Sequence, residues 1–194
     1  QVRYLLIGDD FRFGAKRLGD FAMLAAHASA KGFELHRMPT VTDANGERIS
    51  SSMVRAALAD GDLDRAARLL ARPYTISGHV IHGRKLGRTL GYPTLNVRVP
   101  FEKPALAGIF AVRVHGIAHG PLPGVASLGT RPAVELDGRY LLEVHLFDFD
   151  ADLYGRLVRV EFIRKLRDER SFDSLAALRE QIDADARDAR RALA

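Results

Sequence analysis

Cysteine is absent from the sequence, which excludes disulfides, thiolate zinc sites and cysteine nucleophiles. Tryptophan is absent as well, and aromatic residues make up only 8% of the chain. No apolar run approaches the roughly 20 residues that span a bilayer. The apolar N-terminal run Val2–Gly8 meets Asp9 and Asp10 too soon to form a signal peptide. These absences predict a cytoplasmic protein.

The composition is otherwise that of an ordinary globular protein. Hydrophobic residues account for 47% and charged residues for 27% of 194 residues, enough for one large domain or two small ones. The net charge is +5, which favours an anionic partner, either nucleic acid or a phosphorylated small molecule. Charge alone does not separate these two classes.

The first third of the chain has an α/β pattern. A strand is expected over Val2–Ile7, a helix over Leu18–Ala30 and a second strand over Phe33–Met38, which together form a parallel α/β unit. Two short helices are expected over Met53–Ala59 and Asp62–Ala71.

Short β-rich runs begin after Arg72 and Pro73, which end the preceding helix. These runs, with regular turn signals, predict a closed barrel or a sandwich. A long amphipathic helix is expected over Ser174–Leu193. We therefore expect two domains, 1–72 and 73–194. The expected strands are Tyr74–Ile81, Ile109–His115, Gly124–Leu128, Tyr140–Phe149 and Leu157–Ile163.

A glycine-rich basic segment over residues 78–96 is the most informative part of the chain. Its glycines let backbone amides approach an anion, and basic side chains lie among them. It is not a Walker A loop, because no glycine here precedes Lys-Ser or Lys-Thr. On composition alone, a basic hairpin without a ligand is an equally good interpretation. The residues concerned are Gly83, Gly87, Gly91, Arg84, Lys85 and Arg88.

The sequence Pro93-Thr94-Leu95-Asn96 closes this segment. Thr94 and Asn96 could project from the same face of a strand, and hydroxyl and amide oxygens are suitable ligands for Mg²⁺. For an isolated Thr-x-Asn pair, turn chemistry would be the simpler interpretation.

At this point the sequence resembles the riboflavin kinases. Residues 78–96 match the pattern G-x-V-x-x-G-x-x-x-G-R-x-x-G-x-P-T-x-N, which is typical of that family. Residues 124–132 are similar to its G-V-A-x-x-G-x-R-P turn, residues 143–155 to its catalytic strand, and residues 167–172 to its R-x-E-x-x-F segment. The resemblance extends from Tyr74 to about Ala189.

The resemblance implies a six-stranded Greek-key barrel with a C-terminal helix. It implies that Glu143 is the general base for the 5′-hydroxyl of riboflavin, although alone it would be interpreted as a solvent-facing strand residue. Mg²⁺ and ATP would be the cofactors, with riboflavin and FMN as substrate and product. The other implied site residues are Thr94 and Asn96 for the metal, Gly83, Lys85, Gly87, Arg88, Gly91 and Tyr154 for the nucleotide, and Arg167 and Phe172 for the flavin.

The histidines show no pattern of a zinc site. No two of them have the spacing and partners that zinc requires, so packing on the barrel surface is the better interpretation. They are His79, His82, His115 and His145.

The first third resembles part of an FMN adenylyltransferase domain. Residues 6–14 are similar to V-G-x-D-F-R-F-G, and residues 49–55 to I-S-S-T-x-I-R with Ser52 in place of threonine. The resemblance places Asp9, Arg12, Ser50 and Arg55 in a second, triphosphate-binding site. The His-x-Gly-His motif of that domain occurs nowhere in the chain.

We therefore expect a fragment of a bifunctional riboflavin kinase/FMN adenylyltransferase that has kinase activity and no adenylylation of its own. Its expected partners are small molecules, without nucleic acid or membrane. Two alternatives stay open. A basic barrel that binds nucleic acid would explain the charge, but such modules usually display stacking aromatics along a groove. A flavin-binding remnant without catalytic activity is the other.

Overall fold

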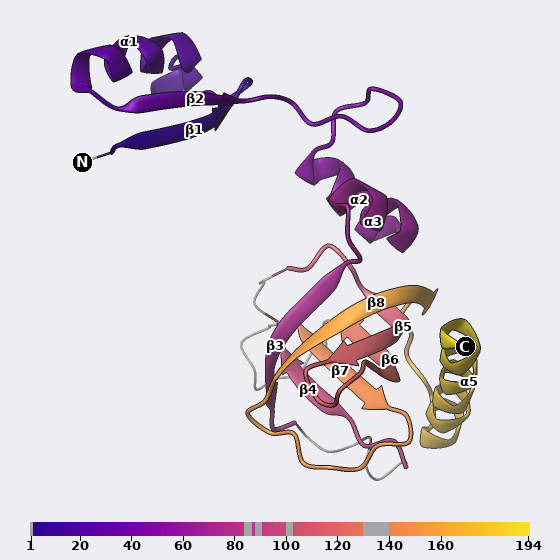
Figure 1. Cartoon of the computed structure of the whole chain (residues 1–194). Helices are drawn as coiled ribbons and strands as arrows, with labels where there is room; N and C mark the ends of the chain where they lie inside the picture. Colours follow the sequence, from indigo (N-terminus) through magenta and orange to yellow (C-terminus); the bar gives the residue numbers. More distant parts are fainter. Residues whose placement is uncertain (1, 84–86, 88–90, 100–102, 130–139) are drawn as a thin grey trace. The chain divides into compact units, whose positions relative to one another are not determined.

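The computed structural model describes residues 2–83, 87, 91–99, 103–129 and 140–194 (Figure 1). The chain forms two compact units, Gln1–Ser50 and Ser51–Ala194, which are described separately. The boundary between the two domains that the sequence predicts, after residue 72, stays a prediction.

The first unit is a small parallel α/β element. Strand β1 (Tyr4–Gly8) pairs in parallel with β2 (Glu34–Met38), and helix α1 (Phe21–Lys31) connects them after a short 3₁₀ turn, η1 (Ala15–Arg17). Parallel strands need such a crossover, because a hairpin can join only antiparallel neighbours. The predicted strand–helix–strand order is confirmed.

Helix α1 begins three residues later than predicted. The carboxylate of Asp20 accepts a hydrogen bond of 3.0 Å from the backbone N–H of Met23, which makes Asp20 the N-cap. Leu18, expected as the first helical residue, lies outside the helix and is exposed. Gly32 ends the helix in the left-handed region, with a φ of 70°, which a glycine adopts without strain. An apolar periodicity alone did not separate the helix from its cap.

In the residues that the structure describes, the elements of the second unit are two short helices, six strands and a long C-terminal helix. All five predicted runs form strands, and the sixth strand, β4, begins at the end of the glycine-rich segment. The elements are α2 (Ser51–Asp60), α3 (Leu63–Leu70), β3 (Thr75–Ile81), β4 (Leu95–Arg98), β5 (Gly108–His115), β6 (Leu122–Gly129), β7 (Leu141–Leu146), β8 (Leu157–Arg167) and α5 (Leu175–Leu193).

The six strands close into an antiparallel barrel in the order β3-β4-β7-β6-β5-β8. Strands β5, β6 and β7 follow one another as neighbours, and β8 returns to pair with β5. The resulting spatial order, 8-5-6-7, is a Greek key. The predicted Greek-key barrel is confirmed, and closure leaves no exposed sheet edge.

Alternate residues of each strand fill the barrel. On β7, Leu142 and Val144 are completely buried while Glu143 between them faces outward, as expected for a strand with a period of two. Helices α2 and α3 extend the same core with Leu58 and Leu63. The interior is therefore packed with side chains, and any ligand site has to lie outside it.

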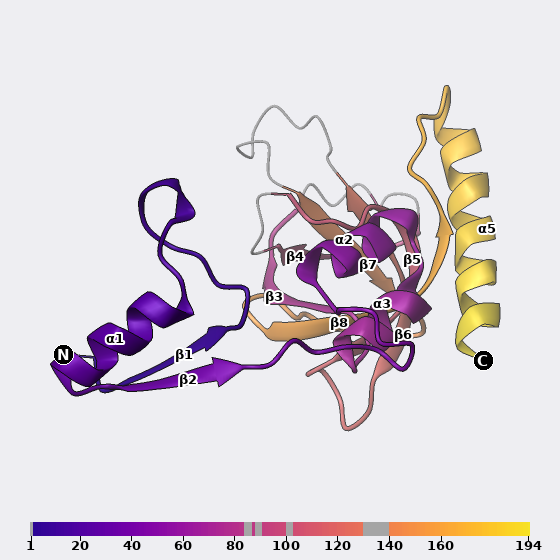
Figure 2. The same ribbon diagram turned by 90° about the horizontal axis from the view of Figure 1, so that it is seen from above.

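Helix α5 covers part of the outer face of the barrel (Figure 2). It packs against outward-facing residues of β5 and β6 and against Phe147 just after β7, which form a second apolar cluster. The 19-residue helix begins at its N-cap Ser174, whose hydroxyl accepts a hydrogen bond from the N–H of Ala177. The cluster consists of Ile109, Ala111, Val125, Phe147, Ala186 and Ala189.

A carboxylate–guanidinium pair holds the C-terminal part of α5. Arg190 donates two hydrogen bonds, of 2.8 and 3.0 Å, to Asp148 just after β7, and its guanidinium lies 4.2 Å from the ring centre of Phe147. This interaction lowers the pKa of Asp148. Within the described residues, neither α5 nor any other helix has the length and apolar character needed to cross a membrane.

The barrel core predicts that alanine substitutions at two leucines on its strands lower the free energy of unfolding by very different amounts. Leu142→Ala opens a cavity at a fully buried site and is expected to lower the free energy of unfolding by about 2–5 kcal/mol. Leu157→Ala, at a residue 59% exposed on β8, should change it by less than about 0.5 kcal/mol. Urea unfolding followed by far-ultraviolet circular dichroism measures both. Equal losses for the two variants would contradict a core inside the barrel.

Candidate active site

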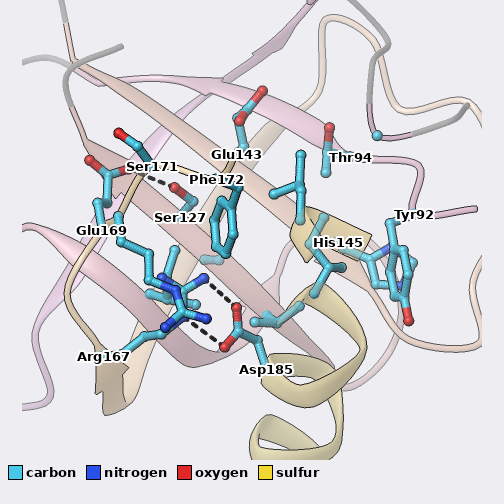
Figure 3. A pocket seen from close by; sticks show the side chains of 17 residues that line it. Tyr92, Thr94, Ser127, Glu143, His145, Arg167, Glu169, Ser171, Phe172 and Asp185 are labelled. Carbon is cyan, nitrogen blue, oxygen red and sulfur yellow. Dashed lines mark hydrogen bonds and ion pairs between the residues drawn. The ribbon is translucent and has the colours of Figure 1, made fainter. Parts of the chain in front are cut away.

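A pocket of about 430 Å³ lies on the outer face of the barrel, beside α5 (Figure 3). Its walls come from β5, β6 and β7, from α5 and from the segment that links β8 to α5. Apolar residues such as Val125 and Ile182 line it together with charged ones such as Glu143 and Arg167. The pocket therefore suits a ligand with both a flat apolar part and a polar part.

The strand register brings three polar side chains into one row. Asn96 on β4 is the direct partner of Glu143 on β7, and Glu143 is in turn the partner of Ser127 on β6. Directly opposed residues of antiparallel strands point to the same face, with Cβ atoms about 4.5–5.5 Å apart. Thr94, two residues before Asn96, lines the pocket with Glu143 on the same side of it (Figure 3).

Asn96 is the most unusual member of this row. Its side chain is only 5% exposed, and its Oδ1 atom accepts no hydrogen bond from any residue that the structure describes. Gly83 packs against it so closely that a Cβ at position 83 would overlap the Asn96 amide. A buried amide oxygen without a donor is costly, and a divalent cation is one partner that would satisfy it. Asn96 and Thr94 therefore fit a magnesium ion.

At the opposite end of the pocket, a partly buried ion pair connects β8 to α5. Arg167 Nε and Nη2 donate to the two carboxylate oxygens of Asp185, at 2.9 and 2.6 Å. Gln181 adds a hydrogen bond of 2.7 Å to the same carboxylate. The Arg167 guanidinium also lies 5.9 Å from the ring centre of Phe172, and that of Arg170 lies 5.0 Å from it. This pair fixes both the helix and the aromatic ring.

The segment between β8 and α5 is also fastened to the barrel. The Ser127 hydroxyl donates a hydrogen bond of 3.0 Å to Glu169, and the Glu169 carboxylate packs on Gly129. A side chain at position 129 would overlap that carboxylate. Because Phe172 follows three residues later, this contact helps to hold the ring in the pocket.

The remaining wall is formed by His145 and Tyr92. The His145 ring packs edge to face against Tyr92, with ring centres 5.0 Å apart. The Tyr92 hydroxyl donates a hydrogen bond to Asp183 of α5. Burial, followed by this hydrogen bond, raises the pKa of Tyr92, so the phenol stays protonated above its usual range.

Comparison with known proteins agrees with this geometry. The family model of riboflavin kinase matches residues 70–193, which include the whole barrel and α5. The chain belongs to the riboflavin kinase family. A second model, FAD synthetase, matches residues 1–53.

The curated relatives of this family member are longer proteins. The bifunctional riboflavin kinase/FMN adenylyltransferase of Escherichia coli (strain K12) is 48% identical over 185 residues, which are 95% of this chain and 58% of the relative. That of Pseudomonas fluorescens is 48% identical over 189 residues, 97% of this chain and 60% of the relative. The chain thus spans less than two thirds of the length of these relatives.

A solved structure resembles this chain in fold. A crystal structure described as the macrolide-efflux protein from Streptococcus pneumoniae has a TM-score of 0.68 and 34% sequence identity, covering 93% of this chain and 58% of that one. This likeness extends over nearly the whole of the riboflavin kinase family member described here.

The structure gathers several of the predicted kinase residues. Five of them line the pocket, namely Gly87, Thr94, Glu143, Arg167 and Phe172. Asn96 lies in register with Glu143, and Gly83 covers it. Tyr154 is not among the residues that line the pocket; it packs on His82, next to Gly83, with ring centres 3.8 Å apart.

The structure says less about the other residues predicted to bind the nucleotide. Gly91 has a φ of 87°, a conformation that favours glycine. Lys85 and Arg88 lie outside the described residues. Within the part of the chain that is described, no cluster of three or more histidine or carboxylate side chains could hold a metal ion.

Sequence reasoning missed most of the residues that line the pocket. Ser127 and Glu169 stand within motifs that resemble the family, but nothing in the sequence shows that they contact each other. His145 alternates with buried residues on β7, which was a usable signal for the outer face. Asp185 carries no sequence signal, because its partner Arg167 is 18 residues away on another element.

The residues that resemble the adenylyltransferase fall in both units. In the first unit, the Asp9 carboxylate accepts hydrogen bonds of 2.9 and 3.0 Å from the Thr40 hydroxyl, and Arg12 lies 3.7 Å from Asp20. Ser50 ends the first unit, whereas Arg55 lies on α2 of the second. A common site for these four residues stays a prediction.

The Arg167–Asp185 pair predicts a strong effect on stability. Asp185→Ala leaves a partly buried guanidinium without its carboxylate and is expected to lower the free energy of unfolding by about 1–3 kcal/mol. The matched control is Asp188→Ala, one turn later, where the exposed pair with Arg191 should contribute less than about 1 kcal/mol. Urea unfolding measures both variants. A loss for Asp185→Ala no larger than that of the control would rule out this role.

Proposed function

We propose that this chain is an ATP-dependent riboflavin kinase that transfers the γ-phosphate of ATP to the 5′-hydroxyl of riboflavin, giving FMN and ADP. The observation that carries the proposal is the position of Glu143. It lies in register with a buried asparagine whose oxygen lacks a donor, at one end of a pocket with an aromatic ring and apolar walls. A carboxylate, a cation site and a flat pocket are what this reaction needs.

The flavin occupies the pocket beside α5. Ile109, Val125 and Ile182 provide apolar surface for a ring system, and Phe172 provides an aromatic face. Arg167 lies at this end, held by Asp185, so its remaining donor capacity can meet the polar edge of the flavin. The ribityl chain then runs toward Thr94 and Glu143 at the other end.

Glu143 acts as the general base. Its carboxylate orients the 5′-hydroxyl and takes its proton as the bond to phosphorus forms. In-line positioning does most of the work in phosphoryl transfer, so one well-placed carboxylate is sufficient on the protein side. The rigid row formed by β4, β7 and β6 supplies that positioning.

Thr94 and Asn96 hold Mg²⁺ together with the phosphates of ATP. When bound, the ion neutralises the negative charge that the phosphates carry into the reaction. Gly83 and Gly87 bring the backbone close to this site. Gly83 packs against the side chain of Asn96, and Gly87 lies against the backbone of Tyr92 and near the side chain of Thr94. Lys85, Arg88 and Gly91 are assigned to the phosphates, and Tyr154, stacked on His82, to the nucleotide.

The first unit is assigned to FMN adenylyl transfer in a longer protein. Asp9, Arg12 and Ser50 are assigned to that site by their resemblance to the motifs of the FAD synthetase family, whose model matches residues 1–53. Arg55 resembles the same motifs but lies beyond the matched residues, on α2. No His-x-Gly-His motif is present in the sequence. Adenylylation by this chain alone is therefore not part of the proposal, and its partners are small molecules: ATP, riboflavin and FMN.

The proposed base is tested with Glu143→Gln, which keeps the size of the side chain and removes its basicity. With Mg²⁺ and ATP, the unaltered chain should convert riboflavin to FMN without FAD, as chromatography shows. The variant should lose roughly 10²- to 10⁴-fold in kcat, because a general base contributes about that much, while still binding riboflavin. Glu180→Gln, at an exposed position on α5, is the control. Equal turnover in both variants would remove Glu143 from the mechanism.

The proposed metal ligand is tested with Asn96→Ala. Calorimetry should show that binding of Mg²⁺·ADP weakens by about tenfold or more, whereas riboflavin affinity is largely retained. Asn45→Ala, at the chain's other asparagine, which is exposed in the first unit, serves as the control. A loss of riboflavin affinity with normal Mg²⁺·ADP binding would show that Asn96 serves the flavin instead.

A further inference from the structure

The ring of His145 contacts the segment that carries Thr94. Its Nδ1 atom lies 2.8 Å from the backbone carbonyl oxygen of Pro93. A carbonyl oxygen can only accept, so Nδ1 carries the proton and donates. His145 is also two residues beyond Glu143 on β7, so both side chains are on the outer face of the strand, and both line the pocket.

This hydrogen bond lies where the β4–β7 ladder ends. The last paired residues are Leu95 and Val144, and continuing the register would place Thr94 opposite His145. Proline has no backbone N–H, so Pro93 cannot donate to a further ladder bond. The His145 side chain therefore continues the connection between the two strands beyond their last backbone pair.

The ring itself is held on two sides. It packs edge to face on Tyr92 and on Phe147, with ring centres 5.0 and 5.8 Å apart. Phe147 belongs to the cluster beneath α5, and Tyr92 is hydrogen-bonded to Asp183 of the same helix. The position of the Nδ1–H is therefore fixed before any ligand binds.

We infer that His145 is a positioning residue for phosphoryl transfer. Through the Pro93 carbonyl it sets the place of Thr94 relative to Glu143, and it takes no part in proton transfer. The inference rests on the proposed kinase function.

Two substitutions separate the hydrogen bond from the ring. His145→Asn keeps a side-chain N–H close to the place of Nδ1, whereas His145→Leu keeps bulk and removes the donor. His145→Leu should lower kcat by roughly 10- to 100-fold, because a displacement of about 1 Å at a reacting group has such an effect. His145→Asn should recover most of this loss, and riboflavin KM should change less than about threefold in both. His79→Asn, at an exposed position on β3, is the control.

Two further readouts distinguish positioning from a merely structural or a chemical role. The pH profile of kcat/KM should keep both limbs in His145→Asn, and loss of a limb would make His145 a proton-transfer group. Calorimetry should show weaker Mg²⁺·ADP binding in His145→Leu than in His145→Asn, with circular dichroism confirming the fold of each.

The outcomes also separate this inference from the proposed function. If the unaltered chain makes no FMN but binds Mg²⁺·ADP, the proposed function fails, and the calorimetric order of the variants still tests the positioning role. If His145→Leu equals the unaltered chain, or if His145→Asn is as impaired as His145→Leu, the positioning role is wrong while the kinase assignment stands.

Discussion

The antiparallel ladder between β4 and β7 is the interaction on which the candidate site depends. Its register places Asn96 opposite Glu143, and the next ladder places Glu143 opposite Ser127. Closure of the barrel prevents these strands from sliding, because a shift by one residue would turn every core side chain outward. Leu142 and Val144, which are fully buried, therefore hold Glu143 in position as effectively as any direct contact. Precision at the site is a by-product of core packing.

Helix α5 supplies a wall of the pocket, which the strands alone cannot form. A barrel with a filled interior offers only convex outer surface, and a pocket arises where the helix stands against that surface. Apolar packing attaches the helix, but the charged pairs with Arg167 and Asp148 fix its place along the barrel. The wall of the pocket is thus set by directional bonds, which an apolar contact would not provide.

The barrel and the outward face of Glu143 could be predicted from the sequence, since both follow from a period of two along short strands and from a long family pattern. The burial of Asn96 could not, because it depends on Gly83 packing against it from a loop. The contact between Arg167 and Asp185 joins a strand to a helix face, and the start of α1 depends on a cap at Asp20. Each of these is a tertiary or capping contact that residue periodicity does not encode. The histidines show the same limit: His145 packs on the barrel surface as predicted, against Tyr92 and Phe147, but the sequence did not indicate that it also lines the pocket.

Strand β7 serves two purposes on its two faces. Leu142, Val144 and Leu146 fill the interior, while Glu143 and His145 face the pocket. Neighbouring residues in one short stretch are consequently under different physical constraints. Inward residues can exchange for others of similar volume and keep the chemistry intact, whereas outward residues can change the chemistry and leave the fold intact. Substitutions on the two faces of this strand are therefore expected to change different properties, stability on one face and ligand chemistry on the other, within the same six residues of chain.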